Sequence, residues 1–392
     1  KEGIVLKKKV TVLGCGLVGS VMALDLAADE GYDVTVCDAS EANLARTKAQ
    51  AKGPLAVRTD VDFASPDSIT AAVKGQDLVI GAVPGFLGYA MLGAVIRAGV
   101  NMSDISFMGE DYREWDAEAK KYGVTTFEDV GVAPGASSVL IGYACTQLDR
   151  VDDVTYSVTG LPTKPEAPFN YKLVFSPDDL IEEYVRPART KRDGKIVTVP
   201  ALSGCKLMKF DIPGIPLPEM EGFFTDGSRT LLDTIPSPNV TEYTLRYPGT
   251  ARDMTLLREI GLFDTEPVDV KGMKVSPRDL FGALAYPRMK LGEKENEFTF
   301  FHVEVTGEKD GKKVRHAYTL YDEKDMATGF PSMSRTTGFP CVIVGRLLAE
   351  GILDMPGVNP PEAVGKNPVA VARMLEELKK RGVKIASSVK EL

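Results

Sequence analysis

Three glycines near the start of the chain have the type and spacing needed to bind a phosphate. The stretch "VTVLGCGLVGS" places Gly14, Gly16 and Gly19 between a β-branched run and a helical pattern. Gly14 allows a tight turn, Gly16 lets the backbone approach a pyrophosphate, and Gly19 permits close packing of helix on strand. The amino end of the helix adds amides and a positive dipole. The motif predicts a dinucleotide site; a purely structural turn is the alternative.

A single carboxylate indicates which dinucleotide would bind. Asp38 ends the second predicted strand, 19 residues after Gly19. A carboxylate at this position accepts hydrogen bonds from the ribose hydroxyls of NAD and repels the additional phosphate of NADP. We therefore predict NAD as the cofactor. The alternatives are a strand-end aspartate that faces water, and Arg46 or Arg58 reaching a phosphate.

The elements that position these residues alternate strand and helix. β-Branched runs occur at residues 9–14, 33–38, 55–60, 77–83, 100–105 and 124–129, with helical patterns between them. One helix has a complete start signal: Ser65 as N-cap, Pro66 in the first turn and Asp67 near the positive end. This rhythm predicts an α/β fold whose N-terminal Rossmann domain has a parallel, doubly wound sheet.

The pattern changes after residue 151 to longer strands and proline-rich connections. Residues 297–322 alternate with period two on both sides of a Gly- and Asp-containing turn, which indicates a hairpin. Asn367, Pro368 and Gly382 bracket an amphipathic helix. We expect a discontinuous NAD-binding Rossmann domain of residues 1–130 with 337–392. Residues 131–336 would form a second α/β domain with a mixed sheet, which binds substrate and supports oligomerisation.

Composition excludes several classes of function. The 392 residues carry a net charge of -8, which argues against nucleic-acid or anionic-membrane binding, because those need clustered Lys and Arg. The five cysteines are scattered and never form C-x-x-C, so we expect neither disulfides nor a metal site, and a cytoplasmic location. No signal-peptide core precedes the first strand pattern. Residues 77–100 are apolar, but Pro84-Gly85 interrupts them, so we predict strand, turn and helix.

The chain resembles the saccharopine dehydrogenase (glutamate-forming) and lysine 6-dehydrogenase family nearly end to end. Five segments, in this order, carry the resemblance: "GVAPGASSV" (131–139), "GLPTKPEAPFNYKLVFSPDDLIEEY" (160–184), "TLRYPGT" (244–250), "TTGFP" (336–340) and "GVNPPE" (357–362). Members of this family oxidise carbon–nitrogen bonds with a nicotinamide cofactor. The resemblance therefore implies an amino-acid dehydrogenase, and relatives are commonly homo-oligomers, so we expect at least a dimer.

Within the family the sequence is more similar to the lysine 6-dehydrogenase branch. Saccharopine dehydrogenases have an aspartate in a D-P-G turn where this chain has Ala133. They also tend to have an arginine in the loop that reads "TDGSRT" here, where Gly227 stands at the matching position and Arg229 follows two residues later. The resemblance thus implies L-lysine as substrate. The alternatives are a saccharopine dehydrogenase, a carboxynorspermidine-type enzyme, or an NAD-binding protein without turnover.

The resemblance also implies site residues. Thr244, Arg246 and Tyr171 would bind substrate, because a guanidinium is a two-pronged clamp for a carboxylate. A structural ion pair is the alternative for Arg246, and a half-buried strand tyrosine for Tyr171. Pro84, Ser106 and the turn Val132-Ala133-Pro134 would border the nicotinamide. The full set expected to bind the cofactor is Gly14, Gly16, Leu17, Val18, Gly19, Asp38, Asp60, Val61, Pro84, Ser106, Val132, Ala133 and Pro134.

Oxidation of a lysine ε-amine needs a base, because its pKa of about 10.4 leaves little neutral amine at neutral pH. Asp104 and Asp129 end predicted parallel strands and are our candidates, together with Tyr171; solvated strand-end carboxylates are the alternative. His302 and His316 alternate with apolar residues, so we predict packed sheet histidines. We interpret the run "SPDDLIEEY" as the capped start of a helix, and an ammonium-binding patch is the alternative.

Overall fold

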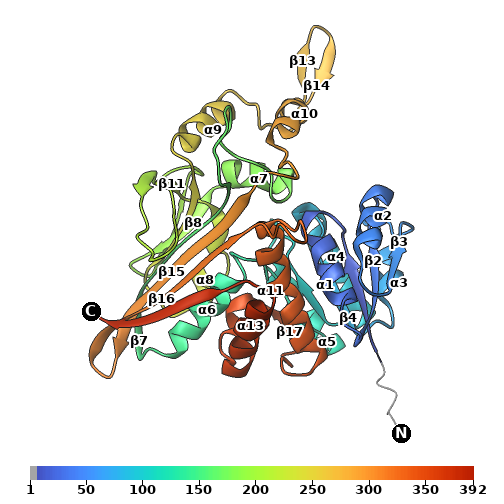
Figure 1. Ribbon diagram of the computed structural model, residues 1–392, viewed down its shortest axis with the longest axis horizontal. Coiled ribbons are helices and arrows are strands. Elements are labelled where there is room, and N and C mark those ends of the chain that lie inside the picture. Colours follow the sequence, from blue (N-terminus) through green and yellow to red (C-terminus); the bar gives the residue numbers. More distant parts are fainter. Residues whose placement is uncertain (1–6) are drawn as a thin grey trace. The chain divides into compact units, whose positions relative to one another are not determined.

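The computed structural model describes residues 7–392, which divide into two compact units (Figure 1). Unit 1 contains the described residues up to Thr146 together with Ser334–Val383, and unit 2 contains Gln147–Met333 and Lys384–Leu392. The α/β fold class predicted from the sequence is confirmed, with a Rossmann-like parallel sheet in one unit and a mixed sheet in the other. No helix within residues 7–392 is both long and apolar enough to cross a membrane.

Unit 1 is built on seven parallel strands in the order β17-β6-β5-β4-β1-β2-β3. All six strands predicted from the sequence form, and β17 is an additional strand from the C-terminal segment. The strands are β1 (Lys8–Leu13), β2 (Tyr32–Cys37), β3 (Leu55–Arg58), β4 (Leu78–Gly81), β5 (Met102–Asp104), β6 (Thr125–Phe127) and β17 (Gly357–Asn359).

Helices cover both faces of this sheet, because successive strand residues point to opposite sides. Val79 of β4 packs with the buried side chains of α3 (Pro66–Val73) and α4 (Gly85–Ala98). On the opposite face, Leu78 and Ile80 contact α11 (Ser332–Ala349), where Gly345 leaves room for them. The other helices are α1 (Leu17–Ala27), α2 (Glu41–Gln50), η1 (Tyr112–Trp115), α5 (Asp116–Tyr122), α6 (Ala136–Thr146), α12 (Pro361–Val364) and α13 (Pro368–Lys380).

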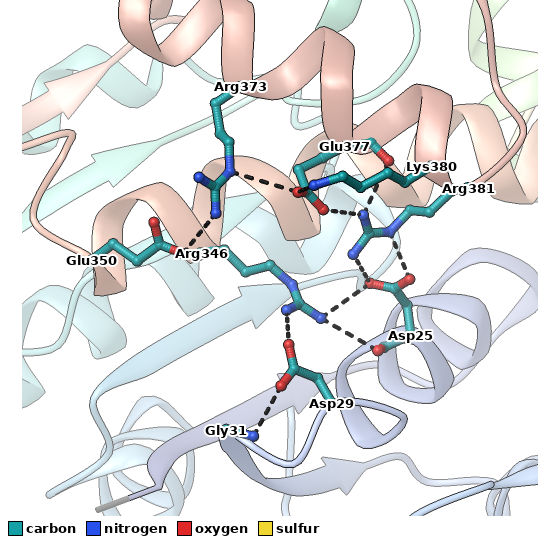
Figure 2. Close-up of polar contacts among 9 residues, drawn as sticks. All are labelled: Asp25, Asp29, Gly31, Arg346, Glu350, Arg373, Glu377, Lys380 and Arg381. Carbon is teal, nitrogen blue, oxygen red and sulfur yellow. Dashed lines mark hydrogen bonds and ion pairs between the residues drawn. The ribbon is translucent and has the colours of Figure 1, made fainter. Parts of the chain in front are cut away.

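An ion-pair cluster fastens the C-terminal helices to the first helix (Figure 2). Arg381, just after α13, donates from Nε and Nη2 to the carboxylate of Asp25 in α1, at 2.7 and 3.0 Å. Arg346 of α11 pairs with Asp25 and Asp29. Burial alone would raise the pKa of Glu377, but hydrogen bonds from Lys380 and Arg381 lower that pKa to about 2.

Unit 2 is built on a nine-stranded mixed sheet. Its main path runs β10-β11-β12-β7-β15-β16-β18, and β8 and β9 extend it beside β12. Only β12 and β7 pair in parallel; the other strand pairs of this sheet are antiparallel. The strands are β7 (Arg150–Pro162), β8 (Ala188–Arg192), β9 (Lys195–Val199), β10 (Lys206–Met208), β11 (Met220–Phe223), β12 (Val240–Arg246), β15 (Glu297–Lys309), β16 (Lys312–Glu323) and β18 (Ile385–Glu391).

The core of unit 2 is rich in aromatic side chains. Tyr184, Phe223, Phe263 and Phe281 pack between the sheet and its helices, with ring centroids 5.1–6.5 Å apart. The helices are α7 (Pro177–Val185), η2 (Asp226–Ser228), α8 (Leu231–Thr234), α9 (Thr250–Glu259) and α10 (Pro277–Met289). A separate hairpin of β13 (Val268–Val270) and β14 (Met273–Val275) lies beside α10 (Figure 1).

The observed units differ from the predicted domain boundaries at three places, of which residues 334–336, now in unit 1, are the smallest. Residues 131–146 were expected in the second domain, but α6 belongs to unit 1, where Gly142 contacts the backbone at Glu362. Residues 384–392 were expected in the Rossmann domain, but β18 belongs to unit 2 because it pairs with β16 from Ile385 to Glu391. Contacts between residues far apart in the sequence determine both of the larger assignments, and such contacts leave little trace in a hydrophobic pattern.

Candidate functional site

The turn between β1 and α1 has the geometry of a phosphate cradle. Gly14 has a φ of +101°, and a Cβ there would lie 2.3 Å from the carbonyl oxygen of Ala82. A Cβ on Gly19 would lie 2.2 Å from the oxygen of Gly14, whereas a Cβ on Gly16 would meet nothing within 4 Å. Two glycines are thus required by packing, and Gly16 leaves open space above the helix amides. These residues fit a bound pyrophosphate.

Asp38 follows β2 directly and is held by two backbone amides. Its Oδ2 accepts the N–H of Cys15 at 2.6 Å, and its Oδ1 accepts the N–H of Ser40 at 2.7 Å. The carboxylate therefore lies against the glycine turn, with lone pairs left for ribose hydroxyls. Arg58 donates from Nε and Nη2 to Asp60 at 3.0 and 2.9 Å, so the guanidinium already has a carboxylate partner.

The other residues assigned to the cofactor share the carboxyl edge of this sheet or the glycine turn. Pro84 follows β4 and precedes α4, Ser106 follows β5, and the Val132-Ala133-Pro134 turn follows β6. Of the remaining positions, Leu17 is 46% exposed, whereas Val18 and Val61 are buried. Ligands of open α/β sheets bind at this edge, outside the strand ends.

Both carboxylates proposed as bases, Asp104 and Asp129, are buried at the same edge. Asp104 ends β5, and burial raises its pKa to about 6. Ser106 Oγ donates to its Oδ1 at 2.8 Å. Asp129 has a φ of +58°, the left-handed region, in the connection after β6. Between β6 and Asp129 stands Glu128, whose pKa is raised well above its ordinary value by burial and by the neighbouring Asp104 carboxylate.

In unit 2, Arg246 ends β12 and is 2% exposed. Its Nη2 donates to Glu183 Oε2 at 2.5 Å and its Nη1 to the carbonyl oxygen of Leu245 at 2.9 Å. The guanidinium carbon lies 4.9 Å from the centre of the Tyr171 ring. Arg246 is thus part of a buried ion pair, as the structural alternative requires. Its Nε has no hydrogen-bond partner among the described residues, which leaves one donor for a carboxylate.

Thr244 lies on the same face of β12, in a second buried polar group. Thr225 Oγ1 donates to Glu242 Oε2 at 2.7 Å and Thr244 Oγ1 donates to Glu242 Oε1 at 3.0 Å. Burial raises the pKa of Glu242 to about 8. A Cβ on Gly227 would lie 3.1 Å from the Glu242 carboxyl carbon, so this carboxyl occupies the space beside Gly227.

The structure gathers Tyr171, Thr244 and Arg246 into unit 2, and the other predicted residues into unit 1. Sequence reasoning missed Glu128, Glu183 and Glu242. Glu183 lies inside the quoted "SPDDLIEEY" segment, and Glu242 shares the period-two face of Thr244 and Arg246, which was the available signal.

The remaining candidates have mainly structural roles. His302 Nδ1 lies 2.9 Å from Thr319 Oγ1, His316 is buried, and burial lowers both histidine pKa values. Ser176 caps α7 by accepting the N–H of Asp179, as the first interpretation of "SPDDLIEEY" predicts. Within residues 7–392, no group of three or more His, Cys, Asp and Glu side chains is arranged to hold a metal ion.

This chain has a Rossmann unit with a glycine turn and a second unit with a mixed sheet. This combination is typical of dehydrogenases that bind a pyridine nucleotide. Residues 10–127 match the saccharopine dehydrogenase NADP binding domain, and residues 131–383 match the saccharopine dehydrogenase C-terminal domain. The chain belongs to the saccharopine dehydrogenase family, which confirms the resemblance seen in the sequence.

One curated relative and two solved structures are similar to this chain, and the solved structures show the same fold. The mitochondrial alpha-aminoadipic semialdehyde synthase of Bos taurus is 23% identical over 91% of this chain, which spans 45% of that relative, so the chain spans about half its length. The structure of saccharopine dehydrogenase (L-Glu forming) from Saccharomyces cerevisiae matches with a TM-score of 0.78 and 20% identity, over 98% of this chain and 100% of that one. Homospermidine synthase from Legionella pneumophila, solved with NAD, matches with a TM-score of 0.66 and 14% identity, over 98% and 92% of the two chains.

Proposed function

We propose that the protein is an NAD-dependent dehydrogenase that oxidises the ε-amine of L-lysine. Protonated lysine, NAD⁺ and water would give 2-aminoadipate 6-semialdehyde, NADH, NH₄⁺ and one proton. The aldehyde would then condense with its own α-amine, losing water, to give piperideine-6-carboxylate. Bound NAD would supply the hydride acceptor, the protein would orient the amine and remove its proton, and one water would then hydrolyse the imine.

The observation that carries this proposal is the absence of two charged anchors, one acidic and one basic, for a multiply charged substrate. Ala133 replaces the aspartate of the saccharopine dehydrogenase turn, and the space beside Gly227 is filled by the Glu242 carboxyl. An arginine at Gly227 would have to displace that carboxyl. Arg246 is left to bind one substrate carboxylate, which suits an amino acid with a single carboxylate better than saccharopine.

NAD is favoured over NADP by Asp38. Its carboxylate is fixed against the glycine turn by two amides, and a 2'-phosphate placed there would be repelled. Of the two arginines considered as phosphate partners, Arg58 is engaged by Asp60, and Arg46 donates to the amide oxygen of Asn43. The family's domain description mentions NADP, so the preference of this chain needs a direct measurement.

Among the proposed catalytic residues, we assign proton removal to Asp129. Asp104 is enclosed by Gly81 and Ser106, and its carboxylate accepts the Ser106 hydroxyl. Burial raises the pKa of Tyr171 well above its ordinary value, so the phenol stays protonated and suits hydrogen-bond donation. Tyr171 would therefore orient substrate beside Arg246 and not accept its proton.

We also propose that the chain forms a homo-oligomer through unit 2. Exposed apolar side chains recur at helical or strand spacing on one segment, at Leu256, Ile260, Val268, Val270, Met273, Leu280 and Leu284. Residues 250–290 contain seven Lys or Arg and six Asp or Glu, so this segment is nearly neutral in a chain of net charge -8. Such a surface suits a second copy of itself. The cytoplasmic location stays a prediction.

Light scattering on the protein as it elutes from a size-exclusion column tests its oligomeric state. We expect at least a dimer, and dissociation on Leu284→Glu but not on the surface control Lys290→Glu. A monomeric wild-type protein would remove this proposal without touching the chemistry.

The function is tested by NADH formation at mildly alkaline pH, where more of the amine is neutral. Purified protein is mixed with L-lysine or L-saccharopine, and with NAD or NADP. Turnover of lysine with NAD and release of ammonia would support the proposal. Turnover of saccharopine alone, with release of glutamate, would contradict it, and tight NAD binding without turnover would favour a non-catalytic protein.

A further inference from the structure

Two carboxyls lie side by side at the carboxyl edge of the unit 1 sheet. In the pairing of β5 with β6, Met102 lies opposite Thr126 and Ser103 opposite Phe127. The next step in this register brings Asp104 beside Glu128. Neighbouring residues of parallel strands are about 4.8 Å apart and point to the same face, so the two side chains leave the sheet together.

On its other side Asp104 borders Gly81 of β4, its partner in the strand register. A Cβ on Gly81 would lie 2.1 Å from Asp104 Oδ1, so the carboxyl leans over the glycine and fills the place of its missing side chain. Ser106 Oγ donates to the same oxygen at 2.8 Å. The position of the Asp104 carboxyl is therefore fixed from two sides.

The pair is enclosed, and three of its four carboxyl oxygens have no hydrogen-bond donor among the described residues. Asp104 and Glu128 are both 0% exposed; the oxygens without a partner are Asp104 Oδ2 and both carboxyl oxygens of Glu128. The ionisable groups that face the pair are Asp129, which follows Glu128, and Cys341 of α11. Burial raises the pKa of the Cys341 thiol, so it stays neutral.

Two charges cannot both be held in this position. Like-charged carboxylates in a buried site repel one another, and each also loses its hydration. A proton on one carboxyl removes the repulsion and supplies the missing donor. The Ser106 hydroxyl stabilises the charged form of Asp104, which places the proton on Glu128.

We propose that Glu128 carries a proton, that Asp104 carries the charge, and that this buried charge is the counter-ion for the cationic ring of oxidised nicotinamide. The inference rests on the proposed function, because it requires a nicotinamide at this edge of the sheet. A fixed negative charge there stabilises the cationic oxidised ring and not the neutral reduced ring. Glu128 is then a positioning residue, because it acts through Asp104 and keeps the net charge of the two carboxyls at -1.

Isosteric amides test the assignment through binding, without turnover. The dissociation constants of NAD⁺ and NADH are measured at pH 7.5 for the wild type, Asp104→Asn and Glu128→Gln, with the exposed Asp33→Asn as control. Asp104→Asn removes the charge, so relative affinity for NAD⁺ should fall about tenfold, as for a unit charge about 10 Å away at an effective dielectric of about 20. Glu128→Gln imitates the protonated acid, so the ratio of the NAD⁺ and NADH dissociation constants should stay within about twofold of the wild-type ratio. The same is expected for Asp33→Asn.

Other outcomes overturn the proposal. If Asp104→Asn and Glu128→Gln lose the same relative affinity for NAD⁺, both carboxyls are charged in the wild type. If neither variant loses affinity, the pair is neutral or the nicotinamide is distant from it. A wild-type titration avoids any folding defect of a variant: preference for NAD⁺ should decline as the pH falls through about 6, where burial places the pKa of Asp104. A preference that holds to pH 5 would contradict the inference.

Infrared difference spectra separate this inference from the proposed function. The wild type minus Glu128→Gln should show one lost carboxylic-acid carbonyl band at pH 7.5, whether or not a nucleotide is bound. If neither nucleotide binds, the proposed function fails. If nucleotides bind and the band is absent, only the assignment of the proton fails.

Discussion

Asp38 is the single side chain on which the proposed preference for NAD depends. Its oxygens accept the amides of Cys15 and Ser40, so the charge cannot rotate away from the ribose position. In Asp38→Asn the charge is removed with the shape retained. The ratio of NAD to NADP efficiency should fall at least about tenfold, since a charged hydrogen bond contributes about 1.5–3 kcal/mol. Steady-state kinetics with both cofactors measure this, and an unchanged ratio would remove Asp38 from the cofactor site.

Arg246 combines an ion pair with a proposed clamp, so its two roles must be separated. Arg246→Lys keeps a charge for Glu183 but loses the planar fork. We expect the KM for the amino-acid substrate to rise about tenfold or more while the Kd of NAD stays within about twofold, because lysine has no counterpart of the Nε donor left for the substrate carboxylate and a charge-assisted hydrogen bond is worth roughly twice a neutral one.

Glu183→Gln is the matched control for that experiment. It frees Arg246 from its partner at 2.5 Å and leaves the guanidinium in place. Substrate binding should then persist or tighten. A KM that rises equally in both variants would indicate that the ion pair holds the local structure and that Arg246 does not contact substrate.

The sequence predicted Asp104 at a strand end, but it did not predict the residue that matters beside it. The β-branched pattern extended the sixth strand to Asp129, whereas β6 ends at Phe127. This difference of two residues puts Glu128, and not Asp129, next to Asp104. Strand ends are set by hydrogen-bonded pairing with neighbours, which one sequence does not reveal. Whether Asp129, Thr244 and Arg246 act in catalysis or binding stays a prediction.

At the scale of elements, local signals were the most predictable. Ser65 accepts the N–H of Ser68, and Asn367 accepts those of Val369 and Ala370, as their N-cap patterns predict. The hairpin predicted at 297–322 forms as β15 and β16. In contrast, β17 is three residues long and lies beside β6 from a distant part of the chain. So short a strand has no periodic pattern of its own.

The attachment of α13 to α1 depends on one guanidinium. Arg381 binds the Asp25 carboxylate through two nitrogens, and both side chains are 14% exposed. Arg381→Met leaves Asp25 and Glu377 with less compensation, and we expect the free energy of unfolding to fall by about 1.5–3 kcal/mol. Lys380→Met on the same helix, at a side chain 55% exposed, should change it by less than about 1 kcal/mol. Equal effects in denaturant unfolding would mean that general helix charge, and not this pair, holds α13.

At the scale of the whole molecule, buried acids occur in both units and act in the same direction. Burial raises the pKa of Asp104 to about 6 in unit 1, and raises the pKa of Glu242 and of Glu297 to about 8 in unit 2. Each folded-state pKa lies above its unfolded value, so the folded chain retains protons that the unfolded chain releases. Their stabilising contribution is present at low pH and is lost as the pH rises through the folded pKa.

Stability should therefore decline between about pH 4.5 and 8, by about 1.4 kcal/mol per pH unit for each such group. Below about pH 4.5 stability should also fall as the pH falls, because Glu377, with a pKa of about 2, loses its ion pairs as it is protonated. Denaturant midpoints between pH 3 and 9 should peak in mildly acidic solution, although the proposed amine oxidation gains from alkaline pH.

Glu297→Gln keeps an oxygen for the Ser332 amide and should flatten the alkaline decline in stability, whereas the exposed Glu266→Gln should not. Stability that rises from pH 6 to 9 would show that these acids are ionised in the folded chain, and the proton assigned to Glu128 would then need the same revision.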